Sequence, residues 1–281
     1  MDFARALWQR IETLHAVTYF GDETVEAGKT LGLPGFWATY FAMRAAPLGP
    51  VGPGVVDATF YNFAPSFVRR WVPAIWDDAS PEEIVRARSA AAAATLRRAA
   101  PDIDDAAEVV AQRLALACEH GSRSGRALYA ANRDLAVPTD PVEALWQYCT
   151  TIREHRGDAH NAALLAQGID GLEAHVMIAA DGGSSPDDLQ KTRGWTVDDW
   201  SSATARCRTR GIVEADGSLT EHGRQVRLDV EATTDRLAYV LVETFEERDR
   251  DELLDALTPV AIAVSRAGVI RYPNPIGLNA L

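Results

Sequence analysis

The sequence has few cysteines, no long apolar run and no surplus of positive charge, and each shortage excludes a class of protein. Cys118, Cys149 and Cys207 are widely spaced and form no CxxC motif, so we expect free thiols in a reducing compartment. The N-terminus lacks a basic region followed by an apolar run, and the longest apolar stretches fall short of a membrane span. We therefore expect a cytoplasmic protein with no membrane partner.

Basic clusters and familiar catalytic motifs are also missing. The net charge of -12 disfavours broad contact with nucleic acid or anionic membranes, which need clustered Lys and Arg. The Walker, Rossmann, HExxH and GxSxG patterns are absent, which removes the enzyme classes that depend on them. What is present is a 47% hydrophobic content over 281 residues, with much alanine and few β-branched runs. This composition predicts a folded, mainly helical protein of one or two domains.

Two short motifs recur at nearly the same interval. "ARALWQ" at 4–9 resembles "VEALWQ" at 142–147, and "GLPGFWATY" at 32–40 resembles "GIDGLEAHV" at 168–176. Because the interval is close to half the chain length, we infer an internal duplication. The stretch "VPTDP" is the expected linker between the halves.

The second half has the element order of a winged helix-turn-helix. After helices expected over 141–167 and 171–180, a short helix follows the cap Ser185, and a further helix begins after the cap Thr196. "IVEADGSLTEHG" then predicts two short strands that flank an Asp-Gly turn. This order resembles the winged helix of MarR-type regulators.

The predicted fold class is therefore all-α with a small β-wing. We expect two tandem winged-helix-like repeats related by a pseudo-twofold axis, so that one chain resembles a dimer and exists as a monomer or a homodimer. The N-terminal, degenerate repeat would cover 1–136, and the C-terminal repeat with its last helices and tail would cover 141–281. In that tail, Pro273 and Pro275 predict an extended segment.

The helix expected over 141–167 carries an unusual run of ionisable side chains, "EHRGDAH". On an ideal helix Arg156 falls in the buried stripe, while His155 and His160 lie at its two edges. A buried guanidinium needs a carboxylate or an anionic ligand. Asp158 follows His155 by three residues and is expected to orient its ring, and Gly157 would mark a close approach by backbone or ligand.

If the first helices of the two halves pair, "LHAVTYF" and "EHRGDAH" face one cavity that would hold a small-molecule ligand or a cofactor. The candidate catalytic residues are His155, His160, Asp158 and Tyr19. The candidate ligand-binding residues are Arg156, His15, Tyr61, Asn62, Glu154 and Trp37. The candidate metal ligands are His155, His160 and His15; a haem or other tetrapyrrole, with histidine as axial ligand, is a further candidate for the cofactor. The alternative is a structural ion-pair network between the halves.

Several longer motifs carry a resemblance over nearly the whole chain. They are "LHAVTYF", "RAAPLGPVGPG", "FYNFAP", "REHRGDAHNAALLAQGIDGLEA", "RGW" and "YPNPIGL". In these motifs the chain resembles an actinobacterial helix-turn-helix-like family that includes SalK. The resemblance implies the fold and an association with natural-product gene clusters, and it supplies no catalytic residues.

The alternative function is that of a MarR-like, ligand-responsive transcriptional regulator, which would bind DNA through the predicted wing and its helices. The expected recognition helix begins with Asp198 and Asp199, and acidic residues outnumber basic ones over 170–235. Carboxylates that face phosphates are repelled, so DNA is a disfavoured partner. The sequence leaves open whether the protein is an enzyme or only binds its ligand.

Overall fold

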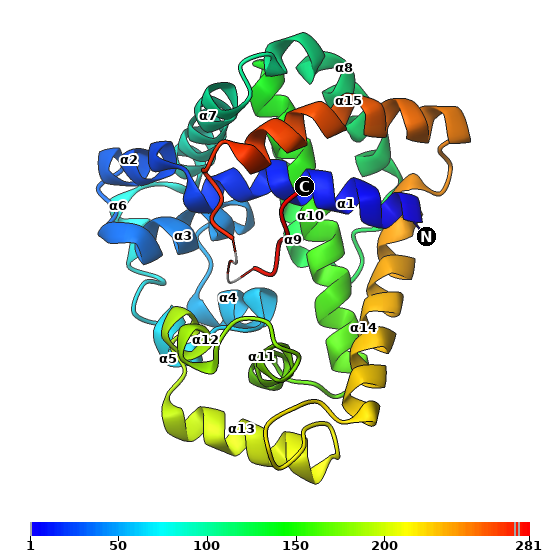
Figure 1. Cartoon of the computed structure of the whole chain (residues 1–281). Helices are drawn as coiled ribbons and strands as arrows, with labels where there is room; N and C mark the ends of the chain where they lie inside the picture. The colour runs from blue at the N-terminus through cyan, green and yellow to red at the C-terminus, as the bar shows by residue number, and fades with distance from the viewer. Residues whose placement is uncertain (1, 273, 275) are drawn as a thin grey trace.

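The computed structural model describes residues 2–272, 274 and 276–281, and within them the chain forms 15 α-helices and one isolated β-bridge (Figure 1). The predicted all-α class is confirmed, and of the two short strands expected for the wing the described residues show a single isolated bridge. The extended segment expected at Pro273 and Pro275 lies outside the described residues. No helix in the described ranges has the length and apolarity that a membrane span requires.

The helices of the larger body come from both ends of the chain (Figure 1). The long ones are α1 (Asp2–Phe20), α2 (Asp22–Thr30), α3 (Gly35–Ala45), α7 (Pro81–Ala99), α8 (Ile103–His120), α10 (Pro141–Ala166) and α15 (Glu247–Arg266). The short ones are η1 (Ala46–Leu48), α4 (Pro53–Phe60), α5 (Pro65–Val68), α6 (Ile75–Asp78), α9 (Ala127–Arg133) and η2 (Val240–Val242).

Helix α10 lies at the centre of this body. It packs against α1, α7, α8, α9 and α14, and more than half of its residues are buried. The expectation of one buried stripe is therefore wrong for α10. His155 is 1% exposed although the helical wheel places it at an edge, because neighbouring helices cover this helix from several directions.

The second, smaller part of the molecule is a helix-turn-helix lobe, defined here as residues 167–239. It consists of α11 (Gly171–Ala180), α12 (Pro186–Arg193), α13 (Val197–Thr209) and α14 (Glu221–Tyr239). Ser185 and Thr196 cap α12 and α13 as predicted. The wing is a single antiparallel bridge between Val213 and Leu219, with its turn at Gly217, where φ is +92°.

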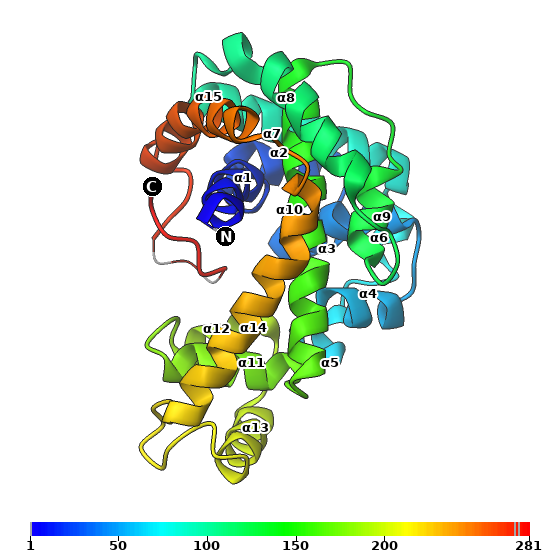
Figure 2. The ribbon, with the colours of Figure 1, turned by 90° about the vertical axis from the view of Figure 1, so that its right-hand side faces the viewer.

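Helix α14 connects the lobe to the body. It runs beside α10 over much of its length, which Figure 2 shows from the side. The lobe has a hydrophobic cluster of its own, which includes Leu172, Ala203 and Val226. The body contains a large cluster around α1, α8 and α10 and an aromatic cluster around α3, α4 and α5.

The tandem repeat is not shown by this architecture. Helices α1 and α10, which begin the two expected halves, do pack against each other. The only β-bridge within the described residues lies in the second half, so a first-half wing is not among the observed elements. The largest hydrophobic cluster also combines residues of both halves, such as Leu14 and Leu145. The division at 137–140 stays a prediction.

Candidate functional site

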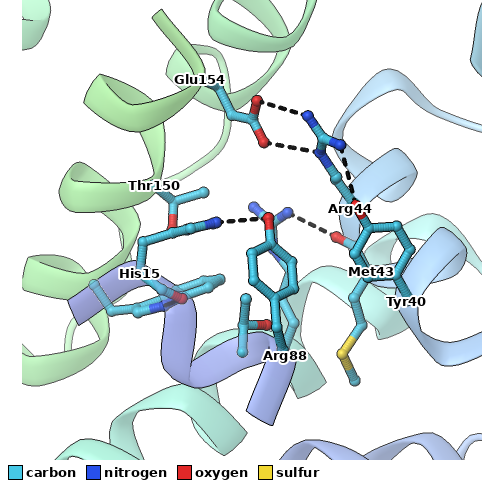
Figure 3. A pocket seen from close by; sticks show the side chains of 10 residues that line it. His15, Tyr40, Met43, Arg44, Arg88, Thr150 and Glu154 are labelled. Carbon is cyan, nitrogen blue, oxygen red and sulfur yellow. Dashed lines mark hydrogen bonds and ion pairs between the residues drawn. The ribbon is translucent and has the colours of Figure 1, made fainter. Parts of the chain in front are cut away.

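A pocket lies where α1, α3, α7 and α10 meet (Figure 3). Its cavity volume is about 20 Å³, below the usual range of ligand pockets, and the atom-free space around it, with the open solvent at its mouth, is about 300 Å³. Side chains from these four helices converge on the pocket, and most of them are polar or charged. The lining residues are His15, Thr18, Tyr19, Tyr40, Met43, Arg44, Arg88, Trp146, Thr150 and Glu154. We call this set the central pocket.

His15 joins α1 to α10 through a chain of hydrogen bonds. Its Nδ1 lies 2.9 Å from Oγ1 of Thr150, and its Nε2 lies 2.8 Å from the hydroxyl oxygen of Tyr19. Burial lowers the pKa of His15 and raises the pKa of Tyr19, so both side chains are neutral near pH 7. In the tautomer with hydrogen on Nε2, the imidazole donates to Tyr19, whose own proton is then free for a ligand.

Glu154 holds two guanidinium groups at the edge of the central pocket. Its carboxylate lies 3.2 Å from Nε of Arg44 and 2.9 Å from Nη1 of Arg153, and Figure 3 shows it directed from α10 toward Arg44. Arg153 also contacts Glu12 at 3.3 Å. Burial alone would raise the pKa of Glu154, but the two guanidinium groups hold it at about 2. These four residues form a largely buried, alternating charge network.

Arg88 differs from these arginines because all its hydrogen-bond acceptors are neutral. Nη1 donates to the carbonyl of Met43 at 2.9 Å, and Nη2 donates at 2.9 Å to the side-chain oxygens of both Asn132 and Gln147. Nε has no hydrogen-bond partner within the described part of the chain. Burial lowers the pKa of Arg88 to about 10, so the group remains charged at neutral pH.

Local sequence explains how Arg88 reaches the pocket. Ser80 and Glu83 form the capping box that starts α7, with Pro81 in its first turn, as the sequence predicts. Ile84 is fully buried, and Arg88 lies one turn later on the same face. The side chain therefore enters the interior of the body, where it also lies 5.4 Å from the ring centre of Trp146.

The helix-turn-helix lobe supplies the second functional feature. The three arginines at the end of α13 bind other parts of the lobe. Arg206 pairs with Asp170 and Glu173, Arg210 pairs with Glu173, and Arg208 donates to two wing carbonyls. The start of α13 exposes Asp198 and Asp199. On α13, therefore, the three arginines are engaged within the lobe, Asp199 accepts hydrogen bonds from Thr196 in the helix cap, and Asp198 is exposed.

A sequence model of a helix-turn-helix family matches residues 4–271. The chain belongs to this helix-turn-helix family. No curated protein and no solved structure matches the chain. The matched range extends far beyond the lobe. It includes α3, α7, α10 and nearly all of α1, so the family model also covers the residues that line the central pocket.

The central pocket brings together only part of the predicted site. His15, Tyr19 and Glu154 line it, which agrees with a cavity between "LHAVTYF" and "EHRGDAH". The other candidates lie elsewhere in this helix-turn-helix protein. Within the described ranges, no group of three or more His, Cys, Asp or Glu side chains is placed to hold a metal ion.

His155 and Asp158 face α9, on another side of α10. Asp158 accepts a hydrogen bond from the backbone N–H of Tyr129 at 2.9 Å, and the ring of His155 packs edge-on against the ring of Tyr129. Nδ1 of His155 has no partner among the described residues, so the expectation that Asp158 orients His155 is wrong. Burial lowers the pKa of His155 to about 3 and raises that of Asp158 to about 6.

Arg156 and His160 face α14. Arg156 donates to Asp235 at 2.6 Å and to Glu231 at 3.2 Å, so the carboxylates it requires come from the chain itself. Nδ1 of His160 lies 3.1 Å from the hydroxyl of Thr234. For these residues the structural alternative, an ion-pair network, describes the contacts that are present. Arg156 also lines a second, mainly apolar pocket beside Trp8.

The last three candidates, Tyr61, Asn62 and Trp37, lie outside the central pocket and contact other parts of the chain. The Tyr61 hydroxyl donates to the carbonyl of Ile169 at 2.5 Å, and the Asn62 carbonyl accepts from the indole N–H of Trp195 at 3.0 Å. Both therefore attach the segment after α4 to the lobe. Trp37 belongs to the aromatic cluster and contacts Tyr40, which does line the central pocket.

Sequence reasoning missed Arg44 and Arg88. A signal existed for Arg88, because it follows the apolar Ile84 by four residues in an otherwise alanine-rich helix. Arg44 follows Tyr40 by four residues, and Nη1 of Arg44 donates to the Tyr40 hydroxyl at 3.2 Å. Like the charges of "EHRGDAH", Arg88 is a charged residue at an apolar position of its helix.

Proposed function

We propose that this protein binds a small organic molecule in the central pocket, between α1, α3, α7 and α10. The observation that carries the proposal is the convergence of His15, Tyr19 and Arg88 on one space that also has an apolar and aromatic part, formed by Tyr40, Met43 and Trp146. Small-molecule sites combine such walls with a few directed polar groups. The resemblance to the SalK-containing family supports a ligand from natural-product metabolism.

Turnover of the bound molecule would depend on His15 and Tyr19. The 2.8 Å contact between His15 Nε2 and the Tyr19 hydroxyl is short enough for proton transfer. As an enzyme, the protein would use neutral His15 as a base: in the tautomer with hydrogen on Nδ1, Nε2 would accept the Tyr19 hydroxyl proton while the Tyr19 oxygen takes a proton from the bound molecule. As a binding protein, it would use the same hydroxyl only as a hydrogen-bond donor.

A haem or metal cofactor has less support than an organic ligand. An axial ligand needs a free imidazole nitrogen, and both ring nitrogens of His15 are hydrogen-bonded. We therefore expect the purified protein to have no absorption band beyond the aromatic region. A Soret band, or stoichiometric metal in elemental analysis, would contradict the proposal of an organic ligand and indicate a bound cofactor.

The experiment is mass spectrometry of molecules released by denaturing the purified protein, together with a thermal-shift screen of small organic compounds. We expect a compound that co-purifies or raises the melting temperature saturably. Tyr19→Phe and His15→Gln should weaken its binding, and His160→Gln, outside the central pocket, should not. Equal binding by all variants, or no binding compound at all, would overturn the proposal.

A second candidate function is DNA binding by the lobe as a ligand-responsive regulator. The order of α11, α12, α13 and the wing favours it, as does the helix-turn-helix family itself. The engaged arginines of α13 count against it. Fluorescence anisotropy with duplex DNA at two salt concentrations tests it, because a regulator would bind with a steep salt dependence.

The internal duplication is also a proposal, and it bears on where the central pocket lies. The contact of His15 with Thr150 places the first helices of the two expected halves face to face at the central pocket. We propose that the pocket occupies the interface of two duplicated, winged-helix-like halves, which would make it the counterpart of a ligand site between two subunits.

A further inference from the structure

Arg88 is a buried guanidinium without a carboxylate partner, and this decides what the central pocket accepts. The side chain is 3% exposed. Its three hydrogen-bond acceptors are a backbone carbonyl and the amide oxygens of Asn132 and Gln147, none of which carries a charge. Among the ion pairs of the described residues, none involves Arg88. A buried cation of this kind is costly unless an anion accompanies it.

The neighbouring charges do not supply that anion. Glu154 is shared by Arg44 and Arg153, and Glu12 is held by Arg153. This alternating network contains two guanidinium groups and two carboxylates, so its charges balance internally. The guanidinium of Arg88 is added to a balanced network, which leaves one positive charge at the central pocket.

We propose that the ligand of the central pocket carries a carboxylate, and that Arg88 provides its counter-charge. This inference rests on the proposed function and names the ligand class. One excess positive charge matches a monoanion. The unpartnered Nε of Arg88 can donate to one carboxylate oxygen. The rings of Trp146 and Tyr40 form walls for an apolar or aromatic body, and the Tyr19 hydroxyl can donate to a second polar group.

The size of the pocket limits the ligand further. The cavity volume is about 20 Å³, so the ligand is either very small, such as acetate, or enters only when the lining side chains move apart. Benzoate, phenylacetate, butyrate and acetate are suitable probes. Their amides are nearly the same shape without the charge, so each pair isolates the contribution of the anion.

The test is isothermal titration of the full-length protein with these four carboxylates and their four amides. We expect at least one carboxylate to bind about tenfold or more tightly than its amide, as a charge-assisted hydrogen bond predicts. Arg88→Gln should abolish this preference, and Arg88→Lys should keep part of it. Arg98→Gln is the matched control, because Arg98 is on the same helix and pairs with Glu23 at the surface.

A second measurement keeps the test decisive if Arg88→Gln binds poorly for structural reasons. Arg88→Gln removes three hydrogen bonds together with the charge, so its melting temperature without a ligand serves only as a baseline. On addition of acetate or another bound probe, the melting temperature of the wild type should rise more than that of the variant. An equal rise in the two proteins would overturn the inference.

The outcomes separate the two proposals. If carboxylates and amides bind equally and Tyr19→Phe weakens both, the pocket is a ligand site and the anion inference alone is wrong. The same holds if the preference for carboxylates persists in Arg88→Gln. If none of the eight probes binds and no molecule co-purifies, both the inference and the proposed function are wrong.

Discussion

Oε1 of Glu154 lies 3.2 Å from Nε of Arg44, which joins the central helix α10 to α3 inside the body. Glu154 and the guanidinium are both largely buried, so neither can be solvated if the other is removed. Arg44 and Glu154 both line the central pocket, and Arg153 binds Glu154 from outside the lining. Their integrity therefore determines both the stability of the body and the shape of the ligand site.

Replacement of Glu154 should be strongly destabilising. Glu154→Gln leaves Arg44 without a carboxylate partner and Arg153 with Glu12 alone, and we expect a loss of about 3–5 kcal/mol in the free energy of unfolding. Urea denaturation followed by circular dichroism measures it. Arg98→Gln, at an exposed ion pair, should cost less than about 1 kcal/mol. Equal losses for both variants would contradict a buried network.

Asp158 should make the protein less stable as the pH rises. Burial raises its pKa from 3.8 to about 6, so the folded state binds a proton more tightly than the unfolded state. The resulting stability is complete below pH 3.8 and is lost as the pH rises through 6. Asp158→Asn still accepts from the Tyr129 N–H and does not titrate.

The free energy of unfolding of Asp158→Asn, relative to the wild type, should therefore increase between pH 4 and 7 by up to about 3 kcal/mol. Denaturation curves at several pH values, or a direct titration of the Asp158 carboxyl by NMR, measure this change. A difference that stays constant with pH would show that Asp158 titrates normally.

Arg156 should couple the body to the helix-turn-helix lobe. Its side chain is 11% exposed and binds Asp235 and Glu231 of α14. Arg156→Gln should cost about 2 kcal/mol and speed hydrogen exchange along α14. Arg5 contacts the same two carboxylates but is 49% exposed, so Arg5→Gln should have a much smaller effect on exchange.

Gly157 does not mark a close approach. A Cβ built there would meet its nearest atoms, on Arg153 and Glu154, at 3.4 Å, which is ordinary contact. Gly157→Ala should therefore raise the free energy of unfolding by about 0.5–1 kcal/mol, because alanine loses less backbone entropy in a helix. A thermal melt measures it. At Gly171, where a Cβ would meet the Tyr61 carbonyl at 2.1 Å, the same change should destabilise.

The three cysteines should be unreactive in the folded protein. Cys118, Cys149 and Cys207 are buried, and burial raises the pKa of each thiol. A chromogenic disulfide reagent should label none of them before denaturation and three equivalents after it. Rapid labelling of the native protein would show that the body or the lobe opens readily.

The sequence by itself determined the helices and much of the lobe. The caps at Ser80, Ser185 and Thr196 act within a few residues, so helix starts at these positions could be predicted. The wing turn at Gly217 is equally local, since only its glycine and the neighbouring aspartate are needed. The sequence also predicted that "LHAVTYF" and "EHRGDAH" would face one cavity, and of the second motif only Glu154 lines the central pocket beside His15.

Only the tertiary structure decided which charged side chains form the site. The partners of Arg156, Asp158 and Glu154 lie on α14, α9 and α3, far away in the sequence, and a helical wheel contains no information about them. Because α10 is covered from several sides, "EHRGDAH" directs its charges to different neighbours and only Glu154 reaches the central pocket. Arg88, which has no carboxylate partner there, comes from an alanine-rich helix; its spacing from Ile84 places it on the buried face, but only the fold shows which acceptors surround it.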